Sequence, residues 1–390
     1  MSDHLLVLNA GSSSLKFAAY TVAGAAPVAR FAGQVEGIGA AARFTVRDAA
    51  GASLAARDEG RLDHGGAVGL VTGWLERAIG GGRVAAVGHR VVHGGADFAA
   101  PVQVDATVMA ALRALVPLAP LHQPHNLAGI DAAAARFPGV PQVACFDTSF
   151  HRSQAWEAQT FALPPRFYDQ GIRRYGFHGL SYEFIARTLA AENPALAAGR
   201  VVAAHLGNGA SLCAMHGGRS VATTMGFTAL DGVPMGTRSG ALDPGLVLHM
   251  ITAMDMRPEE VAHLLYHESG LKGMSGISQD VRAIEAAGTE AARRALSHFA
   301  WRVRQAIGAL AASLGGIDAL VFTAGIGEHA AGMRARICEG LDFLGIAVDP
   351  ARNAAHARDI ATDAATTRVL VVRTDEEGMM ARHMLDVLGR

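Results

Sequence analysis

Several features that would assign this sequence to a specialised class are scarce or absent. Only three of its 390 residues are cysteine (Cys145, Cys213 and Cys338), and no two of them form a Cys-x-x-Cys pair. This scarcity argues against a disulfide framework and favours a reducing compartment. The sequence has no apolar run of about 18 residues or more and no basic segment followed by a signal core. We therefore expect a cytoplasmic protein without a membrane span.

The sequence also lacks an excess of charge of either sign. Its 34 lysines and arginines nearly balance 35 aspartates and glutamates, which gives a net charge of −1. This balance gives no support for nonspecific binding to nucleic acid or to a membrane surface. What the sequence does have is apolar material, since 50% of its residues are hydrophobic. The length and this composition suit two or three domains with large cores.

Short patterns typical of buried strands alternate with helix patterns along the chain, and this alternation indicates an α/β architecture. We expect the strand at 5–8 to form a hairpin with the strand at 15–22. The other expected strands are 84–87, 142–146, 201–205, 319–323 and 368–372, and the expected helices are 68–79, 127–137, 258–266, 290–314 and 377–388.

Two segments that lie half a chain apart resemble each other. "LNAGSSSL" (8–15) and "HLGNGASL" (205–212) each follow an apolar strand, consist largely of small residues and end in Ser-Leu. An internal repeat of this kind predicts two domains of like topology. The alternative is a chance similarity in a chain rich in alanine and glycine.

Three glycine-containing segments after predicted strands are candidates for holding phosphate: "NAGSSSLK", "HLGNGAS" and "AGIGEH". Glycine lets backbone N–H groups approach an anion, and serine adds hydroxyl donors. The first segment fits neither the G-x-x-x-x-G-K-S/T pattern nor the G-x-G-x-x-G pattern. Each alone could equally be a tight turn, but three loops of this kind in one chain favour a nucleotide cleft.

Two arginines and an aspartate stand in positions that suit chemistry. Arg90 ends a predicted strand, and Arg238 lies in "MGTRSG" between glycines. Arginine can bind a carboxylate or a phosphoryl group through two hydrogen bonds, although a structural ion pair is the alternative. Asp147 follows a predicted strand, where open α/β sheets place functional groups, and capping a helix is its alternative role.

Two histidines and an acidic segment complete these candidates. His122 lies in "APLHQPHN" and His178 in "RYGFHGLS", but the chain has 17 histidines, and no zinc-type spacing occurs among them. "TDEEG" (374–378) places carboxylates between a predicted strand and a helix. They either stabilise the positive end of the helix dipole or bind magnesium.

Taken together, these motifs resemble those of the acetate kinase family. The resemblance spans the chain, in order, through "NAGSSSLKF", "GHRVVHGG", "APLHQPHN", "CFDTSFH", "RYGFHGLSYEF", "HLGNGASL", "TTMGFTALDGVPMGTRSGALDPG", "FTAGIGEH" and "RTDEEGMMAR". That family belongs to the superfamily of acetate and sugar kinases, heat-shock-70 proteins and actin. The resemblance implies two duplicated actin-like (ribonuclease H-like) domains around an ATP cleft. The first would be residues 1–148 with the helix at 377–390 packed back on it. The second, 149–376, would bind nucleotide and mediate dimerisation.

The resemblance also implies an activity. It is the reversible transfer of the γ-phosphoryl group of ATP to acetate, giving acetyl phosphate and ADP by direct in-line transfer. Magnesium is the implied metal, with manganese as the alternative, and the implied assembly is a homodimer in the cytoplasm. A propionate kinase of the same family is the alternative enzyme. A nucleotide-operated switch without a small acceptor is the alternative from another class, and it would not require Arg90, His178 and Arg238.

Carried over position by position, the resemblance assigns the site. The implied catalytic residues are Arg90, Asp147, His178 and Arg238, and the implied metal-associated residues are Asn9 and Glu376. The implied substrate-binding residues are Arg90, Val92, Leu121, His122, Phe177 and Ala229. The implied ATP-binding residues are Ser12, Ser14, Lys16, His205, Leu206, Gly207, Asn208, Gly209, Asp280, Val281, Arg282, Gly325, Ile326, Gly327, Glu328 and His329.

The implied roles need one adjustment, and the sequence departs from the family at several places. Acetate is already an anion near neutral pH, so we interpret Asp147 as orienting magnesium, its waters or an arginine rather than acting as a base. Ala229 stands where the family usually has proline, which predicts a roomier acyl pocket and makes propionate a second or even preferred substrate. His329 replaces an asparagine and Val281 an aromatic residue, and both changes bear on nucleotide preference.

Overall fold

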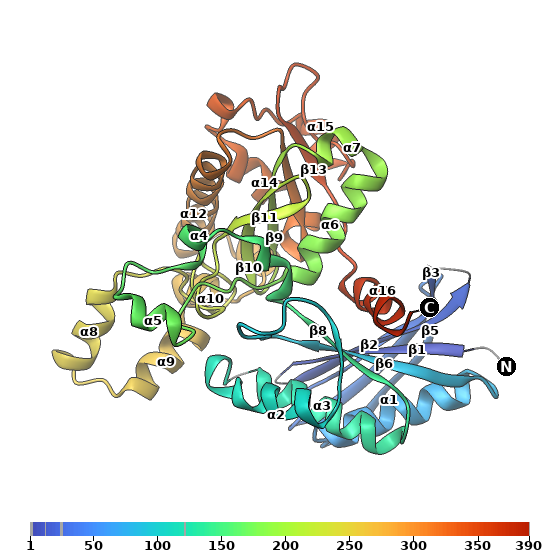
Figure 1. Cartoon of the computed structure of the whole chain (residues 1–390). Coiled ribbons are helices and arrows are strands. Elements are labelled where there is room, and N and C mark those ends of the chain that lie inside the picture. Colours follow the sequence, from blue (N-terminus) through green and yellow to red (C-terminus); the bar gives the residue numbers. More distant parts are fainter. Residues whose placement is uncertain (1–2, 12, 24–25, 121, 390) are drawn as a thin grey trace. The chain divides into compact units, whose positions relative to one another are not determined.

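The computed structural model describes residues 3–11, 13–23, 26–120 and 122–389. The chain divides into two units, which are unit 1 (Met1–Ser149 and Asp375–Arg390) and unit 2 (Phe150–Thr374). Figure 1 colours both along the sequence. Glu376 belongs to unit 1, whereas the sequence had placed it at the end of the second domain. The reason is local, since Asp375 caps the helix that begins at Glu376. The predicted site residues Ser12 and Leu121 lie outside the described residues.

Unit 1 contains an eight-stranded sheet, as far as its residues are described, in the order β5-β4-β3-β2-β1-β6-β8-β7. β1 (Asp3–Ala10) lies between antiparallel β2 (Ser14–Ala23) and parallel β6 (Arg83–Val91). The predicted hairpin of the first two strands is therefore confirmed. β8 (Gln142–Phe146) continues the sheet in parallel to β6. The remaining strands are β3 (Ala26–Glu36), β4 (Ala42–Asp48), β5 (Ser53–Gly60) and β7 (Val102–Gln103).

Helices cover the sheet of unit 1. α1 (His64–Ala78) begins four residues earlier than expected because Asp63 caps it, and it packs beside α3 (Gln123–Arg136). α16 (Glu376–Leu388) comes from the far end of the chain and packs against β1 and β6, as Figure 1 shows. Gly88 on β6 permits this contact, because a Cβ there would lie 2.6 Å from Sδ of Met384. The others are α2 (Ala106–Ala114) and the 3₁₀ helices η1 (Val116–Leu118) and, where unit 1 ends, η2 (Ser149–Ser153).

Unit 2 contains a five-stranded sheet in the order β11-β10-β9-β12-β13, and this order repeats part of the strand order of unit 1. β9 (Arg200–Leu206) lies between antiparallel β10 (Ala210–His216) and parallel β12 (Ala319–Thr323), with β13 (Arg368–Val371) parallel beyond and β11 (Arg219–Thr223) antiparallel at the other edge. The strands β3-β2-β1-β6-β8 of unit 1 have the same order and the same directions. The predicted duplication of topology is therefore confirmed.

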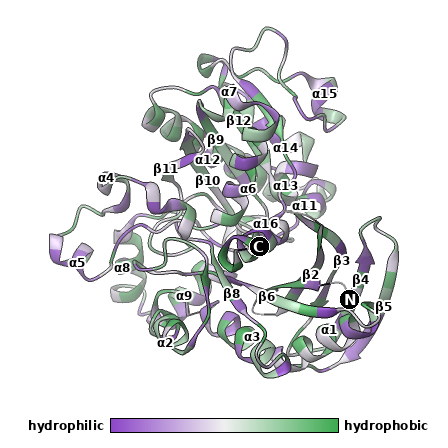
Figure 2. Ribbon diagram, turned by 45° about the vertical axis from the view of Figure 1, so that its right-hand side comes forward, coloured by the Kyte–Doolittle hydropathy of each residue, from purple (hydrophilic) through white to green (hydrophobic). Residues whose placement is uncertain are grey.

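Two long helices sandwich the sheet of unit 2. α12 (Glu290–Leu314), which has its predicted bounds, packs on β9, β10 and β11. α6 (Gly179–Glu192) packs on alternate residues of β9 and β10 through Tyr182, Ile185 and Leu189. Figure 2 shows hydrophobic residues along the central strands between them.

Shorter helices fill the connections of unit 2. They are α4 (Trp156–Gln159), α5 (Pro165–Asp169), α7 (Pro194–Ala197), α8 (Pro244–Thr252), α9 (Pro258–His267), α10 (Gly270–Ser275), α11 (Val281–Ala287), α13 (Ala324–His329), α14 (Ala331–Cys338), η3 (Asp342–Leu344) and α15 (Pro350–Ala354). Across the part of the chain that the structure describes, every helix is too short or too polar to cross a membrane.

The third predicted phosphate loop is corrected by the structure. "AGIGEH" is not a loop, since it forms α13 (Ala324–His329) directly after β12. The chain turns into this helix through Thr323, which is extended, and Ala324, which has a positive φ of 63°. The small side chain of Ala324 makes that turn tolerable, so the chain enters the helix without a linking loop.

Candidate active site

In unit 1, predicted site residues meet where the parallel strands end. Arg90 lies near the end of β6, and Asp147 follows β8 directly. Their side chains form two hydrogen bonds, from Nε to Oδ1 (2.8 Å) and from Nη2 to Oδ2 (2.6 Å). The Asp147 side chain is only 3% exposed. Of the roles considered for Asp147, orienting an arginine is the one this geometry suits, and the catalytic role of both residues stays a prediction.

The two predicted metal-associated residues lie on the remaining side of the same guanidinium. Nη1 of Arg90 is 3.4 Å from Oδ1 of Asn9 and 3.7 Å from Oε2 of Glu376. Burial lowers the pKa of Arg90, but the negative charges of Asp147 and Glu376 outweigh it and raise that pKa above its usual value. Arg90 therefore carries its charge at every pH at which the protein is folded.

Burial disfavours ionisation of the acidic residues at the start of α16. Burial raises the pKa of Glu376, and the nearby Asp147 adds to this, while Arg90 and Lys16 oppose it. Burial and the charge of Glu376 also raise the pKa of Glu377. A buried carboxylate with a raised pKa is stabilised by an added cation. Asn and Glu oxygens suit Mg²⁺, which is commonly held by one or two carboxylates together with substrate phosphates.

This type of site does not need a cage made of protein alone. Among the residues that the structure describes, no group of three or more His, Cys, Asp or Glu side chains could hold a metal ion. The oxygen atoms of Asn9 and Glu376, which both lie beside Nη1 of Arg90, nevertheless have the chemistry that suits a magnesium ion arriving with a phosphate group.

Two side chains of α3 that the sequence did not single out fix this end of unit 1. Asn126 Nδ2 donates to the carbonyl of Ala10 (2.6 Å), and its Oδ1 accepts from the backbone N–H of Val92 (3.0 Å). Gln123 holds the N–H and carbonyl of His93 in the same way (3.3 and 3.1 Å). Both belong to the quoted motif "APLHQPHN", so the signal was present, although only Leu121 and His122, which precede α3, had been named from it.

His64 is a further residue that sequence reasoning missed. Its Nε2 lies 2.7 Å from the carbonyl oxygen of Gly11, in the loop of the β1–β2 hairpin. Its ring stacks on that of His125, with centroids 4.6 Å apart. The loop is therefore held from α1, while Ser14 and Lys16 lie on the β2 strand that leaves it.

In unit 2, His178 and His205 come together. His178 precedes α6 with a positive φ of 59°, a conformation that a residue with a side chain adopts only under constraint. Its ring stacks on that of His205 at the end of β9, with centroids 4.1 Å apart and planes 16° from parallel. Burial and strain of this kind concentrate at functional sites. The loop Gly207–Asn208–Gly209, which links β9 to β10, lies against both rings.

Arg238 and Ala229, predicted for catalysis and for the acyl pocket, also meet in unit 2. Nη1 of Arg238 donates to the carbonyl of Ala229 (2.9 Å) and lies 3.6 Å from Sδ of Met235. Gly236 is required beside it, because a Cβ there would lie 2.1 Å from Oδ1 of Asn208. The glycine in "MGTRSG" thus packs the arginine loop against the glycine loop. Phe177, also predicted for the acyl pocket, is buried in the same unit.

The other predicted ATP-binding residues of unit 2 differ in exposure. Asp280 caps α11 and pairs with Arg282, whose side chain is 87% exposed, while Val281 is buried. Glu328 does not face solvent freely, since its Oε1 accepts from the backbone N–H groups of Ala324 (2.9 Å) and Thr374 (3.1 Å). His329 is exposed. Gly325 and Ile326 lie in the same short helix, α13.

Arg334 binds the backbone of α13, although no motif in the sequence had indicated this arginine. This arginine of α14 is fully buried, and its Nη1 donates to the carbonyls of Gly327 and Glu328 (2.9 Å each). Nε and Nη2 bind Oδ1 and the carbonyl of Asn353 (2.8 and 2.9 Å). Burial lowers the pKa of Arg334. Its signal in the sequence was weak, since it is an arginine on the helix face that also carries Met333, Ile337 and Cys338.

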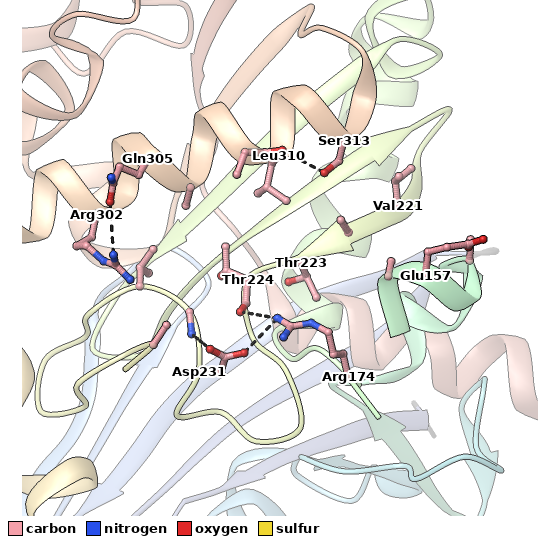
Figure 3. A pocket seen from close by; sticks show the side chains of 18 residues that line it. Glu157, Arg174, Val221, Thr223, Thr224, Asp231, Arg302, Gln305, Leu310 and Ser313 are labelled. Carbon is pink, nitrogen blue, oxygen red and sulfur yellow. Dashed lines mark hydrogen bonds and ion pairs between the residues drawn. The ribbon is translucent and has the colours of Figure 1, made fainter. Parts of the chain in front are cut away.

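A cavity of about 730 Å³ in unit 2 contains none of the predicted site residues. It lies between α12 and β11, and Figure 3 shows the Arg174–Asp231 ion pair (3.1 Å) on one side and Arg302 with Gln305 on the other. The cavity is thus separate from the edge of the sheet at which the histidines meet.

Comparison with known proteins agrees with this arrangement. A family model described as the acetokinase family matches residues 4–382. An acetate kinase of Methylocella silvestris is 51% identical and covers 100% of this chain and 99% of its own length. The crystal structure of Porphyromonas gingivalis acetate kinase matches with a TM-score of 0.89 at 34% identity, covering 99% of this chain and 100% of its own. A propionate kinase from Francisella tularensis matches with a TM-score of 0.91 at 32% identity and 98% coverage of both chains. These matches span nearly the whole chain, and the chain therefore belongs to the acetokinase family.

Proposed function

We propose that this chain is an acetate kinase, which transfers the γ-phosphoryl group of ATP to acetate and reverses the reaction from acetyl phosphate and ADP. The observation that carries the proposal is the orientation of Arg90. Asp147 fixes its Nε and Nη2, and Nη1 is left beside Asn9 and Glu376. A guanidinium held in this way can bind an anionic acceptor next to a metal-bound phosphate.

The chemistry needs positioning and charge neutralisation more than a base. Acetate is an anion near neutral pH and has no proton to lose before it attacks phosphorus. Asp147 therefore orients Arg90 rather than removing a proton. Arg90, Arg238 and His178 would supply positive charge and hydrogen-bond donors to the oxygens of the transferred group. Transfer is direct and in line, from ATP to the acceptor.

Asn9 and Glu376 would hold magnesium, with manganese as the alternative ion. The bound metal would neutralise charge on the β- and γ-phosphates of ATP. Lys16 and Ser14 on β2 would add donors on the side of unit 1. In unit 2 the loop after β9, the start of α11 and the helix α13 would bind the nucleotide.

We include location and assembly in the proposal. The three cysteines of the sequence are free and buried, which suits the reducing cytoplasm. We assign dimerisation to unit 2, where several large apolar side chains are exposed: Trp156, Leu163, Leu248, Met254 and Trp301. Light scattering on the purified chain measures the assembly, and a monomer at micromolar concentration would contradict a homodimer.

The activity is tested by ATP turnover with and without acetate. We expect acetate-dependent ADP release and an acyl phosphate that hydroxylamine traps as the hydroxamate. Both signals should depend on magnesium. ATP hydrolysis that does not respond to acetate would overturn the proposal and favour a nucleotide-operated switch instead.

A second candidate, propionate kinase, is favoured by one residue. Ala229 stands where the family usually has proline, and its carbonyl is held by Arg238, so its small side chain belongs to a fixed segment. Initial rates with formate, acetate, propionate and butyrate separate the two candidates. A kcat/KM for propionate above that for acetate would favour propionate kinase.

A further inference from the structure

The stacked histidines of unit 2 are held by hydroxyl groups in two parallel arrangements. Nδ1 of His178 lies 2.8 Å from Oγ of Ser211, and that Oγ lies 2.5 Å from Oη of Tyr182. Nδ1 of His205 lies 2.9 Å from Oγ of Ser181, and that Oγ lies 2.9 Å from Oγ1 of Thr374. Each imidazole is therefore contacted at Nδ1 by a serine that a second hydroxyl contacts in turn.

The other ring nitrogens face the glycine loop between β9 and β10. A Cβ built on Gly209 would lie 3.2 Å from Nε2 of His178 and 3.9 Å from Nη1 of Arg238. A Cβ built on Gly207 would lie 3.9 Å from Nε2 of His205. The hydroxyl groups thus contact both rings at Nδ1, and Nε2 of each ring faces the loop that the proposed function assigns to ATP phosphates.

The protons in the Tyr182–Ser211–His178 arrangement can be assigned from chemistry. A phenol is a stronger acid than an alcohol, so Tyr182 is the better donor, and it donates to Oγ of Ser211. The proton of Ser211 is then available for Nδ1 of His178, which accepts it with its lone pair. A neutral imidazole that accepts at Nδ1 carries its own proton on Nε2.

The stacking of the two rings supports a neutral His178. Two imidazolium ions with centroids 4.1 Å apart would repel each other, and Arg238 brings a further positive charge to the same loop. The titratable and charged groups that face His178 are Tyr182 on α6, His205 on β9 and Arg238. A positive charge on Arg238, or on His205, disfavours an added proton on the ring.

We propose that Ser211 and Tyr182 are positioning residues that keep His178 in its neutral form with the proton on Nε2. The phosphoryl group would then meet a hydrogen-bond donor that does not depend on protonating the ring. This inference rests on the proposed function, which gives His178 its role. Without the hydroxyl at Nδ1, the ring would be free to take the other tautomer, and Nε2 would donate only in the imidazolium form.

The test combines a pH profile with a direct measurement of the tautomer. In wild type, we expect ¹⁵N NMR of the histidine rings to show a bare Nδ1 and a protonated Nε2 for His178, with the signals assigned from His178→Gln. In Ser211→Ala, kcat should fall on the order of tenfold to a hundredfold near pH 8 and much less near pH 6. Ser211→Thr restores the hydroxyl and should restore the wild-type profile.

A matched control separates this effect from loss of stability. Thr367 carries a buried hydroxyl group in the same unit, and this hydroxyl is hydrogen-bonded to the carbonyls of Ile317 and Leu344. Thr367 directly precedes the first residue of β13. Thr367→Val should lower thermal stability without changing the shape of the pH profile. Should Ser211→Ala fail to fold, Tyr182→Phe tests the same arrangement and should shift the profile in the same direction by a smaller amount.

Two results would overturn the inference. One is a protonated Nδ1 on His178 in wild type, and the other is an equal loss of kcat at every pH in Ser211→Ala. The NMR measurement needs no turnover, so it still decides the tautomer if acetate-dependent activity is absent. In that case the proposed function fails and the tautomer assignment stands or falls separately.

Discussion

The two units use one strand order to build two different kinds of surface. In each, a hairpin is followed by parallel strands whose ends carry the predicted site residues. In unit 1 these ends are charged, with Arg90, Asp147 and Glu376 in direct electrostatic contact. In unit 2 the corresponding region consists of imidazoles, hydroxyls and glycine backbone around His178 and His205.

Under the proposed function, this difference would divide the parts of one reaction between the two units. Carboxylates fix a guanidinium and attract a cation, so the ends of unit 1 suit the metal and the acceptor. Uncharged donors and glycine N–H groups suit an anion such as a nucleotide phosphate without adding negative charge. The loops of the two hairpins also differ in length. The segment between the last paired residues is 11–14 in unit 1 and 207–209 in unit 2.

The largest effect is expected from removing the charge that orients Arg90. Asp147→Asn keeps the side-chain size but leaves Arg90 with an incomplete partner, and buried pairs broken in this way typically cost about 3–5 kcal/mol of stability. We expect kcat to fall roughly 10³-fold, because the acceptor site loses its geometry. Steady-state kinetics with acetate and chemical denaturation measure the two effects.

The control for this prediction is an exposed pair in the same unit. Arg113 and Asp131 are 3.0 Å apart, and both side chains are 57% exposed. Asp131→Asn should change stability by about 0.5 kcal/mol or less and leave kcat unchanged. Near-normal turnover and magnesium dependence in Asp147→Asn would show that unit 1 does not rely on its buried charge.

A buried charge exists in unit 2 as well, and it sharpens the comparison. Arg334 binds neutral carbonyls under α13 instead of a carboxylate. Arg334→Met would leave the carbonyls of Gly327 and Glu328 without this donor, which costs about 1–3 kcal/mol for each buried group. We expect KM for ATP to rise about tenfold with a smaller change in KM for acetate, because α13 is assigned to the nucleotide.

The exposed neighbour Arg336 supplies the matched variant. Arg336→Met should leave both KM values unchanged. Equal increases of the two KM values in Arg334→Met would mean that the arginine supports the whole of unit 2 rather than the nucleotide segment. Isothermal titration with ADP checks the same point without turnover.

How much of this could be predicted depended on whether neighbours in sequence were neighbours in space. The alternation of strands and helices, the first hairpin and α12 followed from local periodicity and were confirmed. The motifs of the whole chain indicated the family and placed Arg90 and Asp147 in one site. Local patterns alone had left a structural ion pair open for Arg90 and a helix cap open for Asp147. Residues that contact the motif residues from other secondary-structure elements were missed.

Asn126, Ser211 and Arg334 show the physical reason. Each makes its contacts across elements that are distant in sequence, such as α3 with β1 or α14 with α15. A hydroxyl or amide in a strand or helix has no local signature until its partner is known. "AGIGEH" was misjudged for the opposite reason, because glycines typical of a loop here form a helix that Glu328 and Arg334 hold in place.

A smaller effect is expected on the stability of the protein at acid pH, and the residue that causes it lies in unit 1. Burial lowers the pKa of His89 to about 4 from its ordinary value of 6.5, against the hydrogen bond with Gln142. A depressed folded-state pKa contributes stability that is complete above pH 6.5 and is lost as the pH falls toward 4. His89→Gln should remove roughly 2–3 kcal/mol of this pH dependence.

Denaturant unfolding at several pH values between these limits measures the slope for wild type and variant. His216, which is exposed at the end of β10, provides the control, and His216→Gln should leave the slope unchanged. A slope in His89→Gln equal to that of wild type would show that other groups carry the acid sensitivity of unit 1.

The smallest effect is expected at the predicted acyl pocket, to which unit 2 contributes Ala229 and Phe177. Ala229→Pro restores the residue usual in the family and should narrow the predicted acyl pocket at a segment whose backbone Arg238 contacts. A methylene in such a pocket is worth about 1–3 kcal/mol, so kcat/KM for propionate should fall about tenfold relative to acetate. Ala241→Asp, at an exposed position of the same unit outside the predicted site, should leave the ratio unchanged. A ratio that stays constant in Ala229→Pro would place the selection of acyl length elsewhere, among Val92, Phe177 and the rest of the predicted acyl residues.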